Sequence, residues 1–254
     1  EPEAAAIATR PGASGRKMGL VVDIGGGTSD FSLFEVGRGG RINILTNQGV
    51  TIGGTDFDRL LSVDHVMAHL GRGGALRKEF GPGVLTAPQA VFADLATWEK
   101  IPFQYGPKAL RAARDMRALA LEPDTFDRLC TLLEYELGHD LAFAVERAKI
   151  GVNANAGQAA RVEMGFLAPG LSAEFSHAQM QASLAPTTDR IRQCARETLR
   201  AAGIAPARVD HVVYVGGSSL LKPVSEAIGA DFPAAEPIYS SVFTAVTDGL
   251  ALAA

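Results

Sequence analysis

The sequence predicts an α/β fold, in which a mixed sheet with flanking helices carries a smaller αβ subdomain. Two short, apolar and β-branched runs, residues 18–23 and 212–215, each end in consecutive glycines, as buried strands do where they enter tight turns. Residues 88–151 are rich in helix-forming residues. Strand-like segments are followed by helix-like segments twice, an order that favours an α/β core with an added subdomain.

The first part of the chain predicts a meander of strands and then a helix. After the strand at 18–23, hydrophobic alternation resumes at residues 31–36 and continues at 41–46 beyond a glycine-rich turn. Apolar residues then recur at helical spacing, which predicts a helix over 55–70. Residues 71–87 are rich in glycine and proline and are expected to form a loop.

The segment 88–151 is predicted to be a compact helical insertion. Its helices should be separated by turn-forming residues, at Pro102, Pro107, Pro123 and Gly138. Residues 161–175 return to a strand-like composition.

The last part of the chain predicts a capped helix, a strand and further helices. Ser176 and Gln179 have the spacing of a capping box. The helix that follows has one apolar face, formed by Ile191, Cys194, Ala195, Thr198, Leu199 and Ala202. The strand at 212–215 should be followed by a helix through Ile228 and by a last helix near the C-terminus.

Composition limits the classes of function. The chain has 254 residues, a net charge of −4 at pH 7 and 47% hydrophobic residues, values typical of a folded globular protein. Without a basic stripe it should not bind nucleic acid. No apolar run approaches the roughly 18 residues of a membrane span, and Cys130 and Cys194 suit neither a disulfide framework nor a zinc site. We expect a cytoplasmic protein that does not enter a membrane.

The most informative segment runs from Asp23 to Asp30 and reads Asp-Ile-Gly-Gly-Gly-Thr-Ser-Asp. Consecutive glycines at a strand end allow positive φ angles, so that backbone N–H groups can surround an anion. Thr28 could donate its hydroxyl to a phosphate, while the two aspartates could hold a hydrated Mg²⁺. A tight hairpin with acidic ends is the alternative interpretation.

Two further glycine motifs strengthen the first. Gly216-Gly217-Ser218 follows a predicted strand and precedes a helix, whose N-terminus favours an anion. Gly53-Gly54 opens the helix at 55–70, and the acidic residues after it favour a role at the helix start over metal binding. Neither a Walker loop nor a dinucleotide-binding glycine motif occurs in the sequence.

Together with residues 145–153, which read Val-Glu-Arg-Ala-Lys-Ile-Gly-Val-Asn, these motifs resemble the nucleotide-binding domain of the seventy-kilodalton heat-shock chaperones. That family belongs to the actin-like ATPases, with a ribonuclease-H-like fold in which two lobes close on ATP and Mg²⁺. The start of the chain, from Glu1 to Ala8, is similar to the helix that ends the family's first lobe. The helical insert, at about 88–138, looks more like the YegD-like branch.

The resemblance implies a second lobe with a core nucleotide-binding subdomain, residues 18–54 and 176–254, and a smaller one, residues 55–175. Residues 1–17 would be the end of the first-lobe helix and a linker. The first lobe of the same protein would be a missing partner, so the chain alone should not turn over ATP. A co-chaperone or a nucleotide-exchange factor would be a further partner.

The resemblance also implies roles for individual residues. Asp23, Thr28 and Asp30 would be catalytic, and the two aspartates would hold Mg²⁺ through water. ATP or ADP would be bound by three groups of residues: Gly25, Gly26, Gly27, Gly53 and Gly54; Glu146, Lys149, Ile150 and Asn153; and Gly216, Gly217, Ser218 and Leu220.

Two departures from the family pattern keep rival functions open. Ile150 and Leu220 stand where the family places an arginine on each side of adenine, which removes cation–π stacking worth about 0.5–2 kcal/mol at each position. A degenerate or filament-forming scaffold is therefore one rival, and a sugar or acid kinase of the same superfamily is the other.

Overall fold

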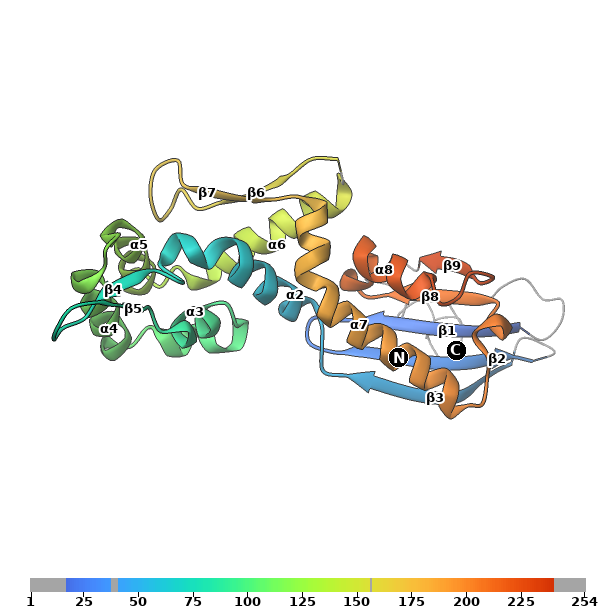
Figure 1. Cartoon of the computed structure of the whole chain (residues 1–254). Helices are drawn as coiled ribbons and strands as arrows, with labels where there is room; N and C mark the ends of the chain where they lie inside the picture. Colours follow the sequence, from blue (N-terminus) through green and yellow to red (C-terminus); the bar gives the residue numbers. More distant parts are fainter. Residues whose placement is uncertain (1–16, 38–40, 156, 240–254) are drawn as a thin grey trace. The chain divides into compact units, whose positions relative to one another are not determined.

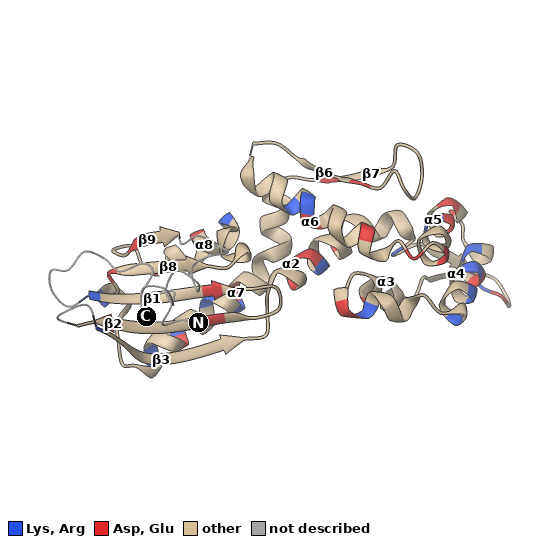
Figure 2. Cartoon of the chain, turned by 180° about the vertical axis from the view of Figure 1, so that it is seen from behind, with Lys and Arg blue, Asp and Glu red and all other residues tan. Residues whose placement is uncertain are grey.

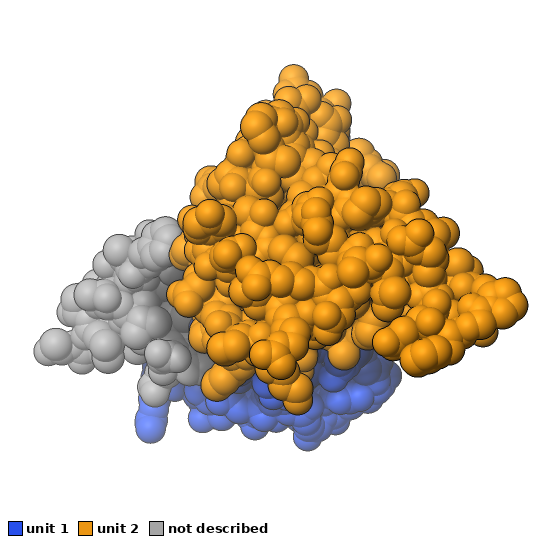
Figure 3. Space-filling model, turned by 90° about the vertical axis from the view of Figure 1, so that its left-hand side faces the viewer, with its two compact units in different colours: residues 1–54, 185–254 blue, residues 55–184 orange. Residues whose placement is uncertain are grey.

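The computed structural model describes residues 17–37, 41–155 and 157–239 (Figure 1). The helix expected between Glu1 and Ala8 and the last helix near the C-terminus lie outside these residues. The chain forms two compact units, shown in different colours in Figure 3. Unit 1 comprises residues 1–54 and 185–254, and unit 2 comprises residues 55–184.

Unit 1 contains a five-stranded mixed sheet in the order β3-β2-β1-β8-β9 (Figure 1). Strands β1 (Lys17–Ile24), β2 (Ser29–Val36) and β3 (Ile42–Val50) pair antiparallel, as the predicted meander requires. Strands β8 (His211–Val215) and β9 (Glu236–Tyr239) extend the sheet in parallel with β1. The mixed sheet with helices confirms the predicted α/β class, whereas the sequence did not predict β9.

The centre of this sheet is buried on both faces. Val21, Phe34, Val36, Val213 and Val215 form a cluster of buried side chains, which explains why β1 and β8 have continuous apolar sequences rather than alternating ones. In contrast, β3 at the sheet edge alternates between half-buried and exposed residues.

Helix α7 (His177–Ala201) covers one face of the sheet of unit 1 with its second half (Figures 1 and 2). The predicted capping box is confirmed: the Ser176 N–H donates to the Gln179 side chain at 2.9 Å, and the Gln179 N–H donates to Ser176 Oγ at 3.3 Å. The predicted apolar face is buried from Ile191 to Leu199. Shorter helical segments in unit 1 are Pro206–Arg208, Gly217–Leu220 and α8 (Lys222–Gly229).

An arginine pair fixes α7 to the turn after α8. Arg192 and Arg196 each donate two hydrogen bonds to Asp231, at 2.6–2.8 Å. Burial raises the pKa of Asp231, but the hydrogen bonds from the two guanidinium groups outweigh burial and lower this pKa to about 2.

The helix predicted over 55–70 in unit 2 changes its winding along its length. It begins as α2 (Gly54–Leu61), widens to a π-helical turn at Ser62–Val66 and tightens to a 3₁₀ turn at Met67–Leu70. Gly71 ends it with a φ of +102°, a conformation that glycine adopts without strain.

Residues 71–87 are not the simple loop that their composition predicts. They form a small hairpin of β4 (Ala75–Arg77) and β5 (Val84–Thr86). Each strand has three residues, too few to show hydrophobic alternation. Gly81 and Gly83, both with positive φ, lie in the connection.

The segment 88–151, predicted as a helical insertion, is largely helical. It contains α3 (Gln89–Leu95), a 3₁₀ segment at Trp98–Gln104, α4 (Pro107–Leu119), α5 (Pro123–Glu134) and α6 (Gly138–Ala154). Prolines begin α4 and α5 because the first helical turn needs no proline N–H. A hairpin of β6 (Ala160–Glu163) and β7 (Ser172–Phe175) completes unit 2.

Charge pairing contributes to the packing of the insertion. Basic residues gather on α4 and acidic residues on α5 (Figure 2), and two ion pairs join them, Arg114–Glu134 and Arg117–Asp127.

Among the described residues, no helix combines the length and apolar character needed to cross a membrane.

Candidate functional site

The first glycine motif forms the turn of the β1–β2 hairpin. Asp23 pairs with Asp30 and Ile24 with Ser29 across the two strands, and the Gly25 N–H donates to the Thr28 carbonyl at 2.9 Å. None of Gly25, Gly26 and Gly27 has the positive φ that the sequence predicted. The turn is therefore a hairpin with acidic ends, and its glycines matter for access to the backbone rather than for left-handed geometry.

Close approach of a second backbone segment explains the second motif. A Cβ atom on Gly53 would lie 2.5 Å from both Gly26 C and Gly27 N, so only glycine lets this segment pass against the turn. The Gly54 N–H donates to the Gly25 carbonyl at 2.9 Å. These contacts hold Gly53 and Gly54 beneath the first glycine turn.

Ser29 adds a contact that sequence reasoning missed. Its side chain is fully buried, and its hydroxyl donates to the Ile52 carbonyl at 2.7 Å. Ser29 therefore anchors the hairpin to the residue before Gly53. A serine inside the motif was visible in the sequence, but its partner became apparent only from the packing.

The third motif reaches the same place because β1 and β8 are parallel neighbours, with Asp23 paired to Val215. Gly216 has a φ of +80°, and a Cβ atom there would lie 2.8 Å from Ile24 C and 2.9 Å from Asp23 Oδ1. Ser218 Oγ lies 2.6 Å from the position of a Cβ on Gly54. All three glycine motifs thus meet in unit 1.

The sequence predicted that the third motif opens an α-helix, but it does not. Gly217 begins a four-residue 3₁₀ turn, and α8 starts only at Lys222. A helix dipole at Gly217 is accordingly weak. The exposed backbone of the turn, rather than a helix terminus, is available to a ligand.

The two aspartates lie on one face of the hairpin, since directly paired residues in antiparallel strands point to the same side. Each carboxylate occupies space left by a glycine of a neighbouring strand end. Asp23 Oδ1 lies against Gly216, and Asp30 Oδ1 lies 2.5 Å from the position of a Cβ on Gly49. Two like charges on one face repel, and a cation would relieve this repulsion.

A nucleotide and a hydrated Mg²⁺ fit these residues. A Cβ atom on Gly26 or Gly27 would meet nothing within 4 Å, so the outer side of the turn is open to a group that approaches its backbone. Thr28 and Asp30 are exposed beside it. In the described parts of the chain, no cluster of three or more His, Cys, Asp or Glu side chains could hold a metal directly.

The fourth predicted group lies on helix α6 in unit 2. Glu146, Lys149, Ile150 and Asn153 follow each other at helical spacing and share a face. Ile150 is 57% exposed, and in unit 1 Leu220 is 37% exposed, so both apolar side chains that replace arginines of the family pattern reach solvent.

Lys149 has a partner that the sequence did not predict. Its buried ammonium donates to Asp58 Oδ2 at 3.0 Å and lies 2.9 Å from Oδ1. Burial raises the pKa of Asp58 although Lys149 acts to lower it, and the nearby Glu146 raises it further. The positive charge of Lys149 is therefore paired with Asp58.

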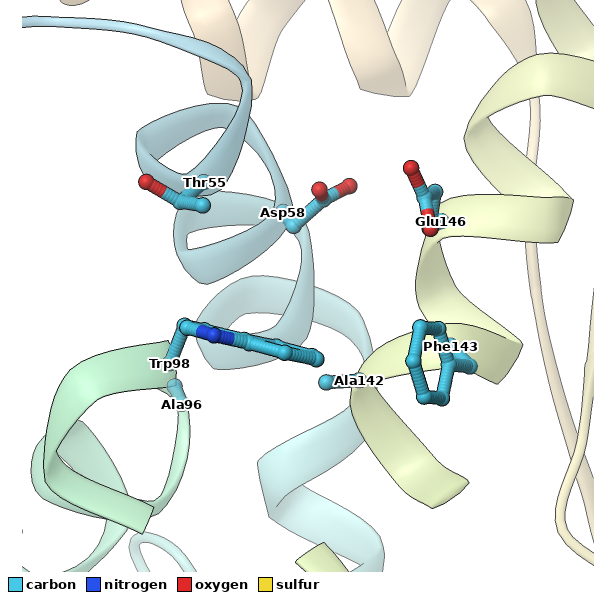
Figure 4. Close-up of a pocket in the computed structure, with 7 residues that line it drawn as sticks. All are labelled: Thr55, Asp58, Ala96, Trp98, Ala142, Phe143 and Glu146. Carbon is cyan, nitrogen blue, oxygen red and sulfur yellow. The ribbon is translucent and has the colours of Figure 1, made fainter. Parts of the chain in front are cut away.

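A cavity of about 240 Å³ lies beside this ion pair, within unit 2. Its walls come from α2, α6 and the segment after α3, through Thr55, Asp58, Ala96, Trp98, Ala142, Phe143 and Glu146 (Figure 4). The indole of Trp98 lies on one side, and the carboxylates of Asp58 and Glu146 point toward one another on the opposite side. Trp98 and Phe143 were not among the predicted site residues.

Comparison with known proteins is consistent with the predicted resemblance. Residues 1–77 match the family described as Hsp70 protein. The chain is 28% identical over 234 residues to the chaperone protein HscA of Pectobacterium carotovorum subsp. carotovorum, covering 91% of this chain and 27% of that protein. It is 23% identical over 228 residues to the chaperone protein DnaK of Thermus thermophilus, covering 90% of this chain and 29% of that protein.

A third relative is similar in extent: the chaperone protein HscA homolog of Variovorax paradoxus is 28% identical over 238 residues, or 94% of this chain and 28% of that protein. The chain thus spans less than a third of the length of these curated relatives. The chain is thus similar to Hsp70 chaperones: residues 1–77 match the family, and these three relatives align with at least 90% of the chain.

Proposed function

We propose that this chain binds ATP or ADP with Mg²⁺, and that the full-length protein is a chaperone-type ATPase that hydrolyses ATP slowly as its lobes close. The observation that supports this most directly is the meeting of three glycine motifs in unit 1. A Cβ atom added to Gly53 would lie 2.5 Å from the Gly26–Gly27 peptide. A Cβ atom added to Gly216 would likewise lie too close to the backbone of Ile24. These two close approaches bring Gly53 and Gly216 against the same turn, whose outer side is exposed.

The exposed turn would hold the phosphates. Gly26, Gly27 and Thr28 are open to solvent, so their N–H groups and the threonine hydroxyl would donate to β- and γ-phosphate oxygens. Gly53 and Gly54 would support the turn from beneath, while Gly217 and Ser218 would contact the rest of the nucleotide. Gly25 would keep the turn closed through its bond to Thr28.

Asp23 and Asp30 would carry the catalytic role. Mg²⁺ would supply charge neutralisation at the phosphates. The two carboxylates would accept hydrogen bonds from waters of the ion and would orient an attacking water. Phosphoryl transfer depends mainly on such positioning and electrostatic stabilisation, so the contribution of these side chains is geometric.

Unit 2 would supply the contacts to the nucleoside. Glu146 and Asn153 would accept or donate hydrogen bonds to it, and Ile150 would provide apolar contact to the base. Lys149 would act mainly through its ion pair with Asp58, because its ammonium is already engaged there. We propose a cytoplasmic protein in which the first lobe and a co-chaperone or nucleotide-exchange factor are the partners.

Calorimetric titration with Mg·ATP and Mg·ADP tests this proposal, on this chain and on the full-length protein. The decisive variant is Gly26→Ala, since its Cβ would meet no protein atom within 4 Å and yet would occupy the space above the turn. Gly37→Ala is the matched control, with its nearest neighbour at an ordinary 3.6 Å.

We expect binding to the full-length protein, weaker binding to this chain, and a loss of at least about tenfold in Gly26→Ala, equivalent to 1.4 kcal/mol. Absence of binding in both proteins would refute the proposal. Nucleotide-independent assembly, measured by light scattering, would then favour a scaffold.

A further inference from the structure

The cavity beside the Lys149–Asp58 pair shares Glu146 with the proposed nucleoside contacts, but its aromatic lining, Trp98 and Phe143, has no part in the proposed function. At about 240 Å³, it is smaller than the roughly 300–1,000 Å³ of pockets that hold drug-sized ligands. It therefore suits a single small head group rather than a whole nucleotide.

The charge around the cavity is negative. Asp58 and Glu146 both line it and point toward one another (Figure 4). The ammonium of Lys149 is bound to Asp58. Within the described part of the chain, the Glu146 carboxylate makes no hydrogen bond or ion pair, and its charge contributes to raising the pKa of Asp58. One carboxylate charge is thus left uncompensated at the mouth of the cavity.

Aromatic rings form the opposite wall. Trp98 makes edge contacts with Phe143, at 5.3 Å between ring centroids, and with His139, at 4.6 Å. These contacts fix the indole, whose own exposure is 38%. An indole face is the strongest aromatic partner for a cation, with an attraction of about 0.5–1 kcal/mol at exposed sites and about 2 when desolvated.

We propose that this cavity binds a guanidinium group, which stacks on Trp98 and donates hydrogen bonds to Glu146. A guanidinium is planar, weakly hydrated and able to stack on an aromatic ring while its N–H groups face a carboxylate. It also carries donors only, and both polar side chains on that wall of the cavity are acceptors. This site shares Glu146 with the proposed nucleoside contacts and goes beyond the proposed function, since it requires no nucleotide.

Other small groups suit the cavity less well. An anion would face two carboxylates. A purine base presents ring nitrogens as acceptors next to the donors on its edges, so part of its edge would oppose Asp58 or Glu146. A neutral urea has the shape of a guanidinium but lacks the charge that offsets Glu146.

Trp98 makes the proposal directly measurable, because it is the single tryptophan of the chain. The experiment titrates the 254-residue chain with methylguanidinium at constant pH and ionic strength, and it follows tryptophan fluorescence. Methylurea is the neutral control of the same shape. We expect a saturable change with methylguanidinium and none with methylurea. Equal responses to the two compounds, or no saturable response, would overturn the proposal.

Variants locate the site. Glu146→Gln keeps the size of the side chain and removes the charge, and we expect it to weaken methylguanidinium binding at least about threefold, as for the loss of one partly exposed charge interaction. Glu163→Gln, at an exposed position of strand β6, is the matched control and should bind like the parent chain. Unchanged binding in Glu146→Gln would overturn the proposal.

Phe143→Leu separates this site from the nucleotide site. Phe143 has no proposed nucleotide contact, so this variant should lose methylguanidinium binding while Mg·ATP binding, measured by calorimetry, is retained. Saturation of the Trp98 signal by adenosine but not by methylguanidinium would instead assign the cavity to a base and overturn the proposal. Acetyl-arginine amide distinguishes two sources of the guanidinium group. Tighter binding than that of methylguanidinium indicates an arginine side chain of a protein, and equal binding indicates a free small molecule.

Discussion

Gly53→Ala should destabilise unit 1 through a clash between two backbone segments. The added Cβ would lie 2.5 Å from Gly26 C and Gly27 N, which is 0.9 Å short of the 3.4 Å at which ordinary contact begins. Because the opposing atoms belong to a peptide and not to a flexible side chain, the turn itself must move. Overpacking of this kind costs about 1–3 kcal/mol, and the lower entropy of the unfolded alanine chain returns about 0.4–1 kcal/mol. The net loss should be about 1–2 kcal/mol.

Equilibrium urea denaturation followed by circular dichroism measures this loss. The stacked tyrosines Tyr214 and Tyr239, 5.2 Å apart in unit 1, provide a near-ultraviolet signal, and Trp98 fluorescence reports unit 2. Gly37→Ala, with its nearest neighbour at 3.6 Å, should be neutral or stabilising by up to about 1 kcal/mol. Free energies of unfolding for the two variants that agree within about 0.5 kcal/mol would refute the reasoning, because they would show that no backbone approaches Gly53.

Three further variants test other contacts by urea denaturation. Ser29→Ala should cost about 1–3 kcal/mol, since it leaves the buried Ile52 carbonyl without its donor; a loss below about 0.5 kcal/mol would contradict this. Asp231→Asn should cost roughly 2 kcal/mol at neutral pH, because a pKa lowered from 3.8 to about 2 corresponds to about 1.4 kcal/mol per unit. In the parent chain this contribution should be present above pH 3.8 and disappear as pH falls toward 2, and the variant should lack that acid transition. Lys149→Met should cost about 3 kcal/mol by leaving the carboxylate of Asp58 without its ammonium. Its loss relative to the parent should grow as pH rises through the raised pKa of Asp58, where the folded parent releases a proton that the folded variant, without Lys149, retains; a loss independent of pH would argue against a titrating Asp58.

Elements with a long periodic pattern were predictable from the sequence. The strands of the β1–β2–β3 meander, the insertion and the capped start of α7 all lie where hydrophobic spacing and local side-chain chemistry placed them. Short elements were not predictable: β4 and β5 have three residues each and β9 has four. Pairing with neighbouring segments defines such strands, and a single sequence does not reveal that pairing.

The candidate site divides in the same way. Glycine spacing indicated the three motifs. However, Gly26 lacks the predicted positive φ, and the motif is instead explained by the close approach of Gly53, a long-range contact that composition cannot show. Lys149 carried the right charge for a ligand, yet its partner Asp58 lies 91 residues away. The roles of the predicted residues in nucleotide binding stay predictions.

The parallel pairing of β1 with β8 affects how the protein folds during its synthesis on the ribosome. Asp23 pairs with Val215, and all of unit 2 is encoded between them. At about 5–20 residues per second, β1 waits for its partner for roughly 10–40 seconds after its own synthesis. During that time the hairpin of β1 and β2 has an unpaired, apolar edge, which is the type of edge that associates with other chains. Until β8 is synthesised, this edge of β1 can pair with strands of other chains.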